Sequence, residues 1–217
     1  MDSGGISSGR SGMRTAASSM AKIEGVTGVI LAGGVSRRMG KNKALLKLNG
    51  IPLVEKVYLA LGALFDDIVL VTNTPDEYSF LPCRTTPDIY PGAGSIAGLH
   101  AGMAASNTER IFVAACDMPF LNADLVRMLC NYDTEAEAVV PLNGEGFFEP
   151  LHAVYAVTAL DTARDIIENG DKSILILLNR IRTILISYQE VRSIAGAEES
   201  FRNINTPEEF TAAQLRT

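Results

Sequence analysis

Short apolar segments that alternate with helix-forming segments constrain the fold of this chain more than any other feature. Each apolar segment spans four to six residues and is followed by turn residues, which is typical of strands buried on both faces of a sheet. The predicted strands are 26–31, 68–72, 111–115, 138–142, 151–154 and 183–187. The predicted helices are 52–64, 96–105, 121–130, 156–168 and 173–179, with a last helix that opens at Thr206-Pro-Glu-Glu.

This alternation predicts the α/β class, with a Rossmann-like, mainly parallel sheet that is covered by helices on both faces. The segments 138–142 and 151–154 have no helix between them, so one local antiparallel or mixed pairing is expected. The passage 82–94 is rich in turn residues. No repeat or linker divides the 217 residues, which suit a single domain.

The N-terminal residues differ in composition from the rest of the chain. Residues 1–24 are rich in Ser, Gly and Ala and lack the apolar core of a secretory signal. We therefore predict a disordered leader at 1–24 and a folded domain at 25–217.

The composition excludes several classes of function. A formal net charge of -6 argues against non-specific binding to nucleic acid or to an anionic membrane. The longest apolar runs are too short to span a bilayer. The three cysteines (Cys83, Cys116 and Cys130) have no Cys-x-x-Cys spacing and suggest neither a zinc site nor a disulfide framework, so a reducing, cytoplasmic location is predicted.

The first predicted strand ends in a glycine turn beside a cluster of positive side chains. Leu31 is followed by Ala32, Gly33 and Gly34, whose small size lets backbone N–H groups approach a ligand closely. Four cations follow within seven positions: Arg37, Arg38, Lys41 and Lys43. Because the chain as a whole is acidic, this local charge favours a polyphosphate ligand, such as the tail of a nucleoside triphosphate. A tight turn alone would explain the glycines but not the cations, although a solvated surface role stays open for each of Arg37, Arg38 and Lys41.

Two common phosphate-binding motifs do not fit this chain. A P-loop needs Gly-x-x-x-x-Gly-Lys-Ser/Thr, but the glycine after Gly34 comes one position late and Asn42 stands where the hydroxyl residue belongs. A dinucleotide-type pattern, Gly92-Ala-Gly94-Ser-Ile-Ala-Gly98, follows the turn Asp88-Ile-Tyr-Pro91 rather than a strand. A nicotinamide-dependent dehydrogenase is therefore the weakest candidate.

The run Leu31-Ala-Gly-Gly-Val-Ser-Arg-Arg-Met-Gly-Lys-Asn-Lys43 resembles the nucleotide-binding motif of the molybdenum cofactor guanylyltransferases. The resemblance covers residues 26–215 and continues, in the expected order, through four more motifs: Gly94-Ser-Ile-Ala-Gly98, Cys116-Asp-Met-Pro-Phe120, Glu149-Pro-Leu-His-Ala-Val-Tyr155 and Phe201-Arg-Asn-Ile-Asn-Thr-Pro-Glu208. It implies a nucleotide-diphospho-sugar transferase-like fold. The implied reaction is transfer of GMP from GTP to the terminal phosphate of molybdopterin, with release of pyrophosphate. The pair Gly33-Gly34 resembles the guanylyltransferases rather than the cytidylyltransferases.

The resemblance also implies roles for particular residues. Lys43 is the expected catalytic lysine, assisted by Arg37 and Asp117. The expected nucleotide-binding residues are Leu31, Ala32, Gly33, Gly34, Lys43, Asn73, Asp88, Gly94 and Asp117, with Asn73 and Asp88 recognising the guanine. Without the resemblance, Asn73 would equally fit the role of a turn residue. The family commonly has Pro where Ser95 stands, which leaves the path of this loop open.

Asp117 follows the predicted strand 111–115, so its carboxylate lies at the carboxyl edge of the sheet, where open α/β sheets bind ligands. A carboxylate beside a triphosphate usually holds Mg²⁺, and Asp117 matches the metal-binding aspartate of the family. The alternative is that Asp117 caps the following helix, but Asn122 and Pro119 are closer to its start.

Asn203 and Asn205 alternate in an extended segment, so both side chains would face the acceptor side of the site, or else serve as turn residues. Glu149 and His152 belong to a segment that could face the pterin, although His152 alone is better explained as a satisfied interior histidine. The implied partners are GTP, molybdopterin and the proteins that deliver molybdopterin and mature molybdoenzymes. Three alternatives stay open: a molybdopterin cytidylyltransferase, a sugar-phosphate nucleotidyltransferase and a non-catalytic nucleotide-binding module.

Overall fold

The computed structural model describes residues 21–33, 42–132 and 135–214. Most of the predicted leader, together with Gly34, Arg37, Arg38 and Lys41, lies outside these ranges. The described chain makes contacts from its first residue: Ala21 O accepts a hydrogen bond from Arg127 at 2.6 Å, and Ile23 is buried, with its N–H donating to the Leu64 carbonyl at 2.7 Å.

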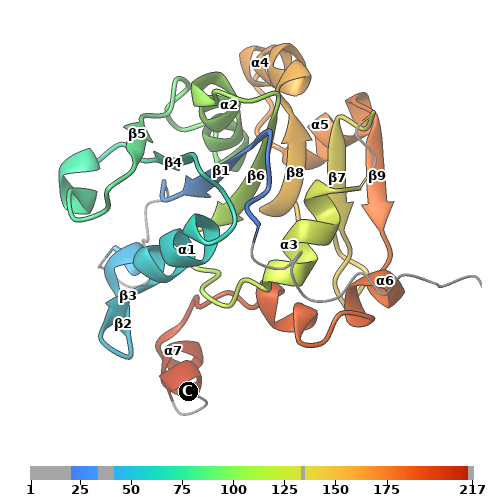
Figure 1. Ribbon diagram of the computed structural model, residues 1–217. Coiled ribbons are helices and arrows are strands. Elements are labelled where there is room, and N and C mark those ends of the chain that lie inside the picture. The colour runs from blue at the N-terminus through green and yellow to red at the C-terminus, as the bar shows by residue number, and fades with distance from the viewer. Residues whose placement is uncertain (1–20, 34–41, 133–134, 215–217) are drawn as a thin grey trace, which may run out of the picture.

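A seven-stranded sheet forms the centre of the molecule, in the order β5-β4-β1-β6-β8-β7-β9 (Figure 1). Strand β8 is antiparallel to both of its neighbours, and the other neighbouring pairs are parallel. The mainly parallel sheet and the antiparallel pairing of the fourth and fifth predicted strands are therefore confirmed. The bounds are β1 Val26–Leu31, β4 Ile68–Val71, β5 Arg84–Thr86, β6 Arg110–Ala115, β7 Ala138–Pro141, β8 His152–Ala156 and β9 Thr183–Ile186.

Helices cover both faces of this sheet because successive strand side chains point to opposite sides. Ile30, Leu70 and Phe112 pack on one face and Val29, Val69 and Val113 on the other. The first face is covered by α1 (Leu53–Gly62), α3 (Ala123–Cys130) and α6 (Tyr188–Arg192). The second face is covered by α2 (Ser95–Ala105), α4 (Leu160–Glu168) and α5 (Ile174–Arg180).

Helix α2 lies very close to β1 because it presents glycine to the strand. A Cβ on Gly102 would stand 2.6 Å from a methyl carbon of Val29, so no larger residue fits there without a shift. The same approach brings the beginning of α2 to the carboxyl edge of the sheet.

The last helix, α7 (Pro207–Gln214), packs apart from the main sheet, against the short hairpin of β2 (Lys47–Leu48) and β3 (Ile51–Pro52). It opens with a reciprocal cap: the Glu209 N–H donates to the Thr206 hydroxyl, and the Thr206 N–H donates to the Glu209 carboxylate, each at 3.1 Å. The predicted start of this helix is confirmed.

Several predicted boundaries are wrong. The passage 82–94 contains the edge strand β5, and β8 runs on through Ala156, so the helix predicted at 156–168 begins only at Leu160, after a 3₁₀ turn (Val157–Ala159). Helix α6 and the β2–β3 hairpin were not predicted. None of the helices in the described parts of the chain combines the length and the apolar character that a membrane span requires.

Candidate active site

Three parallel strands end side by side at one edge of the sheet. Leu31 of β1 is paired with Val71 of β4 and with Ala115 of β6. The pairing continues past the strand ends, since the Ala32 N–H donates to Val71 O at 2.9 Å and the Cys116 N–H donates to Leu31 O at 3.1 Å. The residues that follow these strands are therefore held together by backbone hydrogen bonds.

These strand ends form the floor of a cleft of about 290 Å³. This volume is at the lower end for small-molecule sites, so the cleft suits a ligand that fills it with one part and extends along the sheet edge with the rest. Of the described residues that the sequence predicts to bind nucleotide, all but Asn73 line it: Leu31, Ala32, Gly33, Lys43, Asp88, Gly94 and Asp117. The predictions for Gly34 and Arg37 lie outside the described residues.

Lys43 begins a 3₁₀ turn, η2 (Lys43–Leu45), at one wall of the cleft. The turn is capped by Asn42, whose side-chain oxygen accepts the Ala44 N–H at 3.1 Å. The Lys43 ammonium donates to Asn205 Oδ1 at 3.1 Å, across 162 positions of sequence. The structure thus brings the predicted catalytic lysine together with one of the two predicted acceptor-side asparagines.

Asp117 lies half-buried at the end of β6. It does not cap α3, because the Asn122 side chain accepts the Asp124 and Leu125 N–H groups there. Burial raises the pKa of the Asp117 carboxyl, an effect that Lys43 partly offsets.

The segment that carries the two asparagines lies beside Asp117, since the Ile204 N–H donates to Asp117 O at 2.9 Å. The Oδ1 atom of Asn203 is buried and has no hydrogen-bond partner. Asp117 and Asn203 thus offer two oxygens of the type that Mg²⁺ prefers. The Asn203 oxygen has no partner, and Lys43 offsets only part of the effect of burial on Asp117. No cluster of three or more His, Cys, Asp or Glu that could hold a metal occurs within the described ranges.

Asn73 and Asp88 form a reciprocal pair at the other side of the cleft. The Asn73 amide donates to Asp88 Oδ2, and the Asp88 N–H donates to Asn73 Oδ1, each at 2.9 Å. Asp88 lines the cleft, and its carboxylate lies close to Gly33 and Gly98. Asn73 therefore orients Asp88, whereas the sequence suggested that the two residues would act side by side.

Gly94 precedes α2 with φ 73° and ψ -154°, a conformation available essentially only to glycine. The helix therefore begins at the cleft, which Ser95 and Gly98 also line. The Lys172 ammonium supports the turn by donating to Gly92 O at 2.8 Å.

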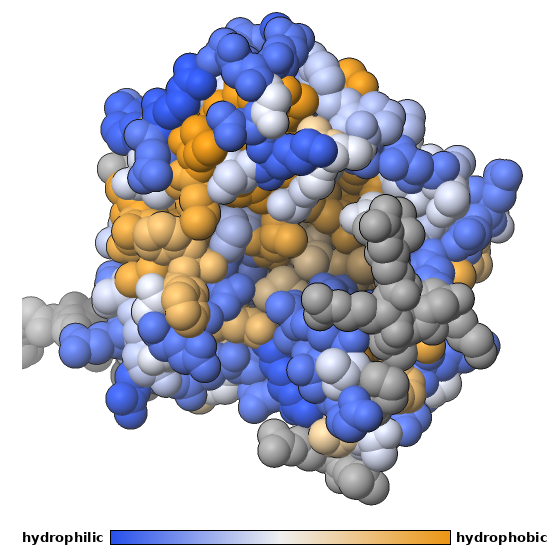
Figure 2. Space-filling model, turned by 180° about the vertical axis from the view of Figure 1, so that it is seen from behind, coloured by the Kyte–Doolittle hydropathy of each residue, from blue (hydrophilic) through white to orange (hydrophobic). Residues whose placement is uncertain are grey.

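The hairpin between β7 and β8 reaches the same edge, because β8 runs antiparallel to β6. Its residues Phe147 and Phe148 are exposed, while Glu149 is half-buried and accepts a 2.8 Å hydrogen bond from Asn143. Burial raises the pKa of the Glu149 carboxyl. Figure 2 shows that apolar surface gathers on the face seen from behind, with hydrophilic surface around it.

His152 is fully buried, as expected, but it is not satisfied: neither ring nitrogen has a hydrogen-bond partner. Phe112 and Phe201 pack against it edge-on, with ring centroids 5.1 and 5.3 Å away. The cleft is also lined by Asn42, Cys116 and Leu151, which were not predicted as site residues. Of these, Asn42 carried a usable signal, since Asn before a short turn is a typical cap.

A mainly parallel sheet with a cleft at the carboxyl ends of its strands, lined by Lys43 and Asp117, fits the class of α/β nucleotidyltransferases. Comparison with known families makes this specific, because residues 28–184 match the model described as MobA-like NTP transferase domain. The chain belongs to this family, and the prediction of an enzyme of the nucleotidyltransferase class is confirmed.

Individual relatives carry names that agree with this family assignment. The chain is 36% identical to the molybdenum cofactor guanylyltransferase of Desulfosudis oleivorans, over 88% of this chain and 96% of the relative. It is 34% identical to the probable molybdenum cofactor guanylyltransferase of Peptoclostridium acidaminophilum, over 84% and 85% of the two chains.

Solved structures confirm the fold. The crystal structure of molybdopterin-guanine dinucleotide biosynthesis protein A from Archaeoglobus fulgidus aligns with a TM-score of 0.77 at 30% identity, covering 88% of this chain and 97% of that one. The 4-diphosphocytidyl-2C-methyl-D-erythritol synthase of Anaerococcus prevotii aligns with a TM-score of 0.64 at 12% identity, over 88% of this chain and 95% of that one. This second likeness shows the fold alone.

Proposed function

We propose that the chain transfers GMP from GTP to the terminal phosphate of molybdopterin and releases pyrophosphate. The names of its relatives support this reaction, and the observation that carries it is the Asp88 carboxylate, fixed in the cleft by Asn73. Guanine presents N1–H and N2–H₂ as neighbouring donors, and an oriented carboxylate can accept from both. Asp88 is therefore the proposed reader of the base, and Asn73 holds it in position.

The proposed phosphate site lies between Ala32–Gly33 and Lys43. An oxygen of the molybdopterin phosphate attacks the α-phosphorus of GTP, a new O–P bond forms, and the bond to the β-phosphate oxygen breaks as its electron pair leaves with pyrophosphate. The attacking phosphate is already an anion at neutral pH, so no strong base is needed. Catalysis then rests on positioning and on neutralising charge, which is the role proposed for the Lys43 ammonium.

We propose that Asp117 holds a Mg²⁺ ion, with Asn203 Oδ1 as a second protein oxygen. The raised pKa of Asp117 and the unpaired Asn203 oxygen support this, because a cation would offset more of the burial of the carboxylate and would contact the free amide oxygen. Mg²⁺ held there would supply positive charge that neutralises the phosphates and the leaving pyrophosphate. Asn205, which accepts the hydrogen bond from the Lys43 ammonium, would orient Lys43.

The acceptor would extend from the α-phosphate toward the β7–β8 hairpin. Phe147 and Phe148 offer exposed aromatic surface there, which suits the flat ring system of a pterin. Proteins that deliver molybdopterin or receive the dinucleotide would approach from the same side.

Incubation of the protein with Mg²⁺, GTP labelled at the α-phosphate, and molybdopterin tests the proposal. The expected result is a labelled dinucleotide with an equal amount of pyrophosphate. Parallel reactions with CTP and UTP, and with sugar 1-phosphates as acceptors, separate the alternative nucleotidyltransferases. Preferred use of CTP or of a sugar phosphate would overturn the assignment, and GTP binding without pyrophosphate release would indicate a non-catalytic module.

A further inference from the structure

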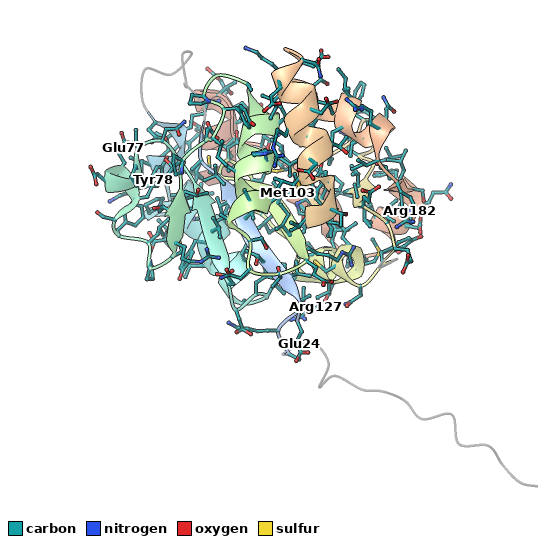
Figure 3. All side chains as sticks on the ribbon, turned by 90° about the horizontal axis from the view of Figure 1, so that it is seen from above. Glu24, Glu77, Tyr78, Met103, Arg127 and Arg182 are labelled. Atoms are coloured by element: carbon teal, nitrogen blue, oxygen red, sulfur yellow. The ribbon has the colours of Figure 1, made fainter. Side chains whose placement is uncertain are left out.

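A partly buried hydrogen bond joins Asn42, which precedes Lys43 in the motif that resembles a nucleotide-binding motif, to Tyr78, which belongs to no motif with an assigned function. Asn42 Nδ2 donates to the Tyr78 hydroxyl at 2.9 Å and to Glu77 Oε2 at 2.6 Å. Figure 3 labels Glu77 and Tyr78, which lie in the 3₁₀ helix η3 (Pro75–Tyr78) after β4. We propose that the Asn42–Tyr78 link is a positioning device for Lys43, an inference that rests on the proposed role of Lys43.

Both polar atoms of the Asn42 side chain form hydrogen bonds. Its oxygen accepts the Ala44 N–H at the start of η2, and the two hydrogens of its amide go to Glu77 and Tyr78. An amide held at both ends has a single orientation, so the turn that it caps is fixed relative to η3. Lys43 is the first residue of that turn.

Tyr78 gives the link its rigidity. The side chain is 1% exposed, and burial raises the pKa of its hydroxyl, which therefore keeps its proton. That proton is directed to the Ala32 carbonyl at 3.5 Å. One hydroxyl thus contacts residues on both sides of the sequence interval 33–41, Ala32 before it and Asn42 after it.

Lys43 is consequently held at two points. Asn42 fixes its backbone through the cap, and Asn205 accepts a hydrogen bond from its ammonium at 3.1 Å. The bond from Asn42 to Glu77 is exposed to solvent, whereas the hydroxyl of Tyr78 is buried, so the Tyr78 contact is expected to contribute more.

Tyr78→Phe removes the hydroxyl and keeps the ring, and Tyr58→Phe is a matched control. Tyr58 also donates one 3.5 Å hydrogen bond to a carbonyl, that of Pro82, and does not line the cleft. We expect kcat to fall about fivefold to tenfold in Tyr78→Phe, the scale of one lost hydrogen bond. The KM for GTP should stay within about twofold, because the groups that bind the nucleotide remain. Tyr58→Phe should behave as wild type.

Asn42→Ser provides a second variant, since serine keeps a cap acceptor but cannot reach Tyr78. If both variants break the same link, the double variant should lose no more kcat than the worse single one. Multiplying losses in the double variant would contradict the link. If Tyr78→Phe does not fold, Asn42→Ser alone still provides the comparison.

A second readout does not depend on turnover. Competitive acylation of amines, followed by peptide mass spectrometry, measures how freely the Lys43 ammonium reacts. Release of the link should make Lys43 react at least about twofold faster in Tyr78→Phe and in Asn42→Ser, but not in Tyr58→Phe. Unchanged Lys43 reactivity and unchanged kcat in both variants would overturn the inference. A wild-type protein that forms no dinucleotide would instead refute the proposed function, and the acylation comparison would still decide whether the link positions Lys43.

Discussion

His152 should make the protein sensitive to acid. Its ring is fully buried without a hydrogen-bond partner, and burial lowers its pKa to about 3. In the unfolded chain the pKa of a histidine is about 6.5. Between these two values the unfolded state binds a proton that the folded state does not, so stability falls as the pH decreases from about 6.5 toward 3.

The size of the effect follows from these pKa values. On moving from pH 7 to pH 5, protonation of the unfolded state at this one residue lowers the free energy of unfolding by about 2 kcal/mol. His152→Leu replaces the ring with an apolar side chain of similar size that does not titrate. The free energy of unfolding of the variant should therefore fall by about 2 kcal/mol less than that of the wild type over the same pH interval.

Urea unfolding of both proteins at pH 7 and at pH 5 measures this difference, with equal m-values as the check that both unfold alike. The comparison uses the change with pH, so any packing cost of leucine at pH 7 cancels. A free energy of unfolding that falls equally in both proteins would refute the reasoning, as would an NMR titration that gives His152 a pKa near 6.5.

Four predictions concern the proposed chemistry. Lys43→Ala should fold normally and lose roughly 100-fold or more of its turnover in the dinucleotide assay, the scale for one preorganised charge contact; wild-type turnover would exclude the catalytic role. Asp117→Asn should raise the Mg²⁺ concentration needed for half-maximal activity, and an unchanged metal titration would exclude the ligand role. Because burial raises the pKa of Asp117, wild-type activity at limiting Mg²⁺ should start to fall, as pH decreases, at a higher pH than the usual pKa of an aspartate would give. Asp88→Asn should abolish the preference for GTP over ITP, which lacks the 2-amino group, in a competition assay; a retained preference would mean that another group reads the base.

The fold was predictable where local signals and burial agree. Strands such as 26–31 and 111–115 are apolar because both of their faces are covered, and their predicted ends differ from the observed ones by at most one residue. Edge strand β5 escaped prediction because Arg84 and Thr85 are exposed, so its sequence needs no apolar pattern. Helix α6 is five residues long and depends on a capping box between Ser187 and Glu190 rather than on periodicity.

The sequence was enough to locate the candidate site at the strand ends, but not to predict the contacts between its side chains. Parallel strands end at one edge, so Leu31 and Asp117 could be placed near each other from the order of the elements alone. The pairing of Asn73 with Asp88, by contrast, is a side-chain contact whose geometry no spacing rule supplies. The sequence therefore identified both residues and assigned the same role to each, whereas the structure makes one the support of the other.

Backbone hydrogen bonds explain why the distant C-terminal segment reaches this site at all. The ladder between β1 and β6 continues to the Cys116 N–H, and the next residue, Asp117, accepts the Ile204 N–H with its own carbonyl. Because side chains alternate along such a segment, fixing the backbone of Ile204, whose side chain is buried, also fixes where its neighbours Asn203 and Asn205 lie. A register shift of one residue between β1 and β6 would move Asp117 and this segment together, so the proposed metal ligands would keep each other but lose Lys43. The register of two core strands thus determines whether the positive and negative halves of the proposed site meet.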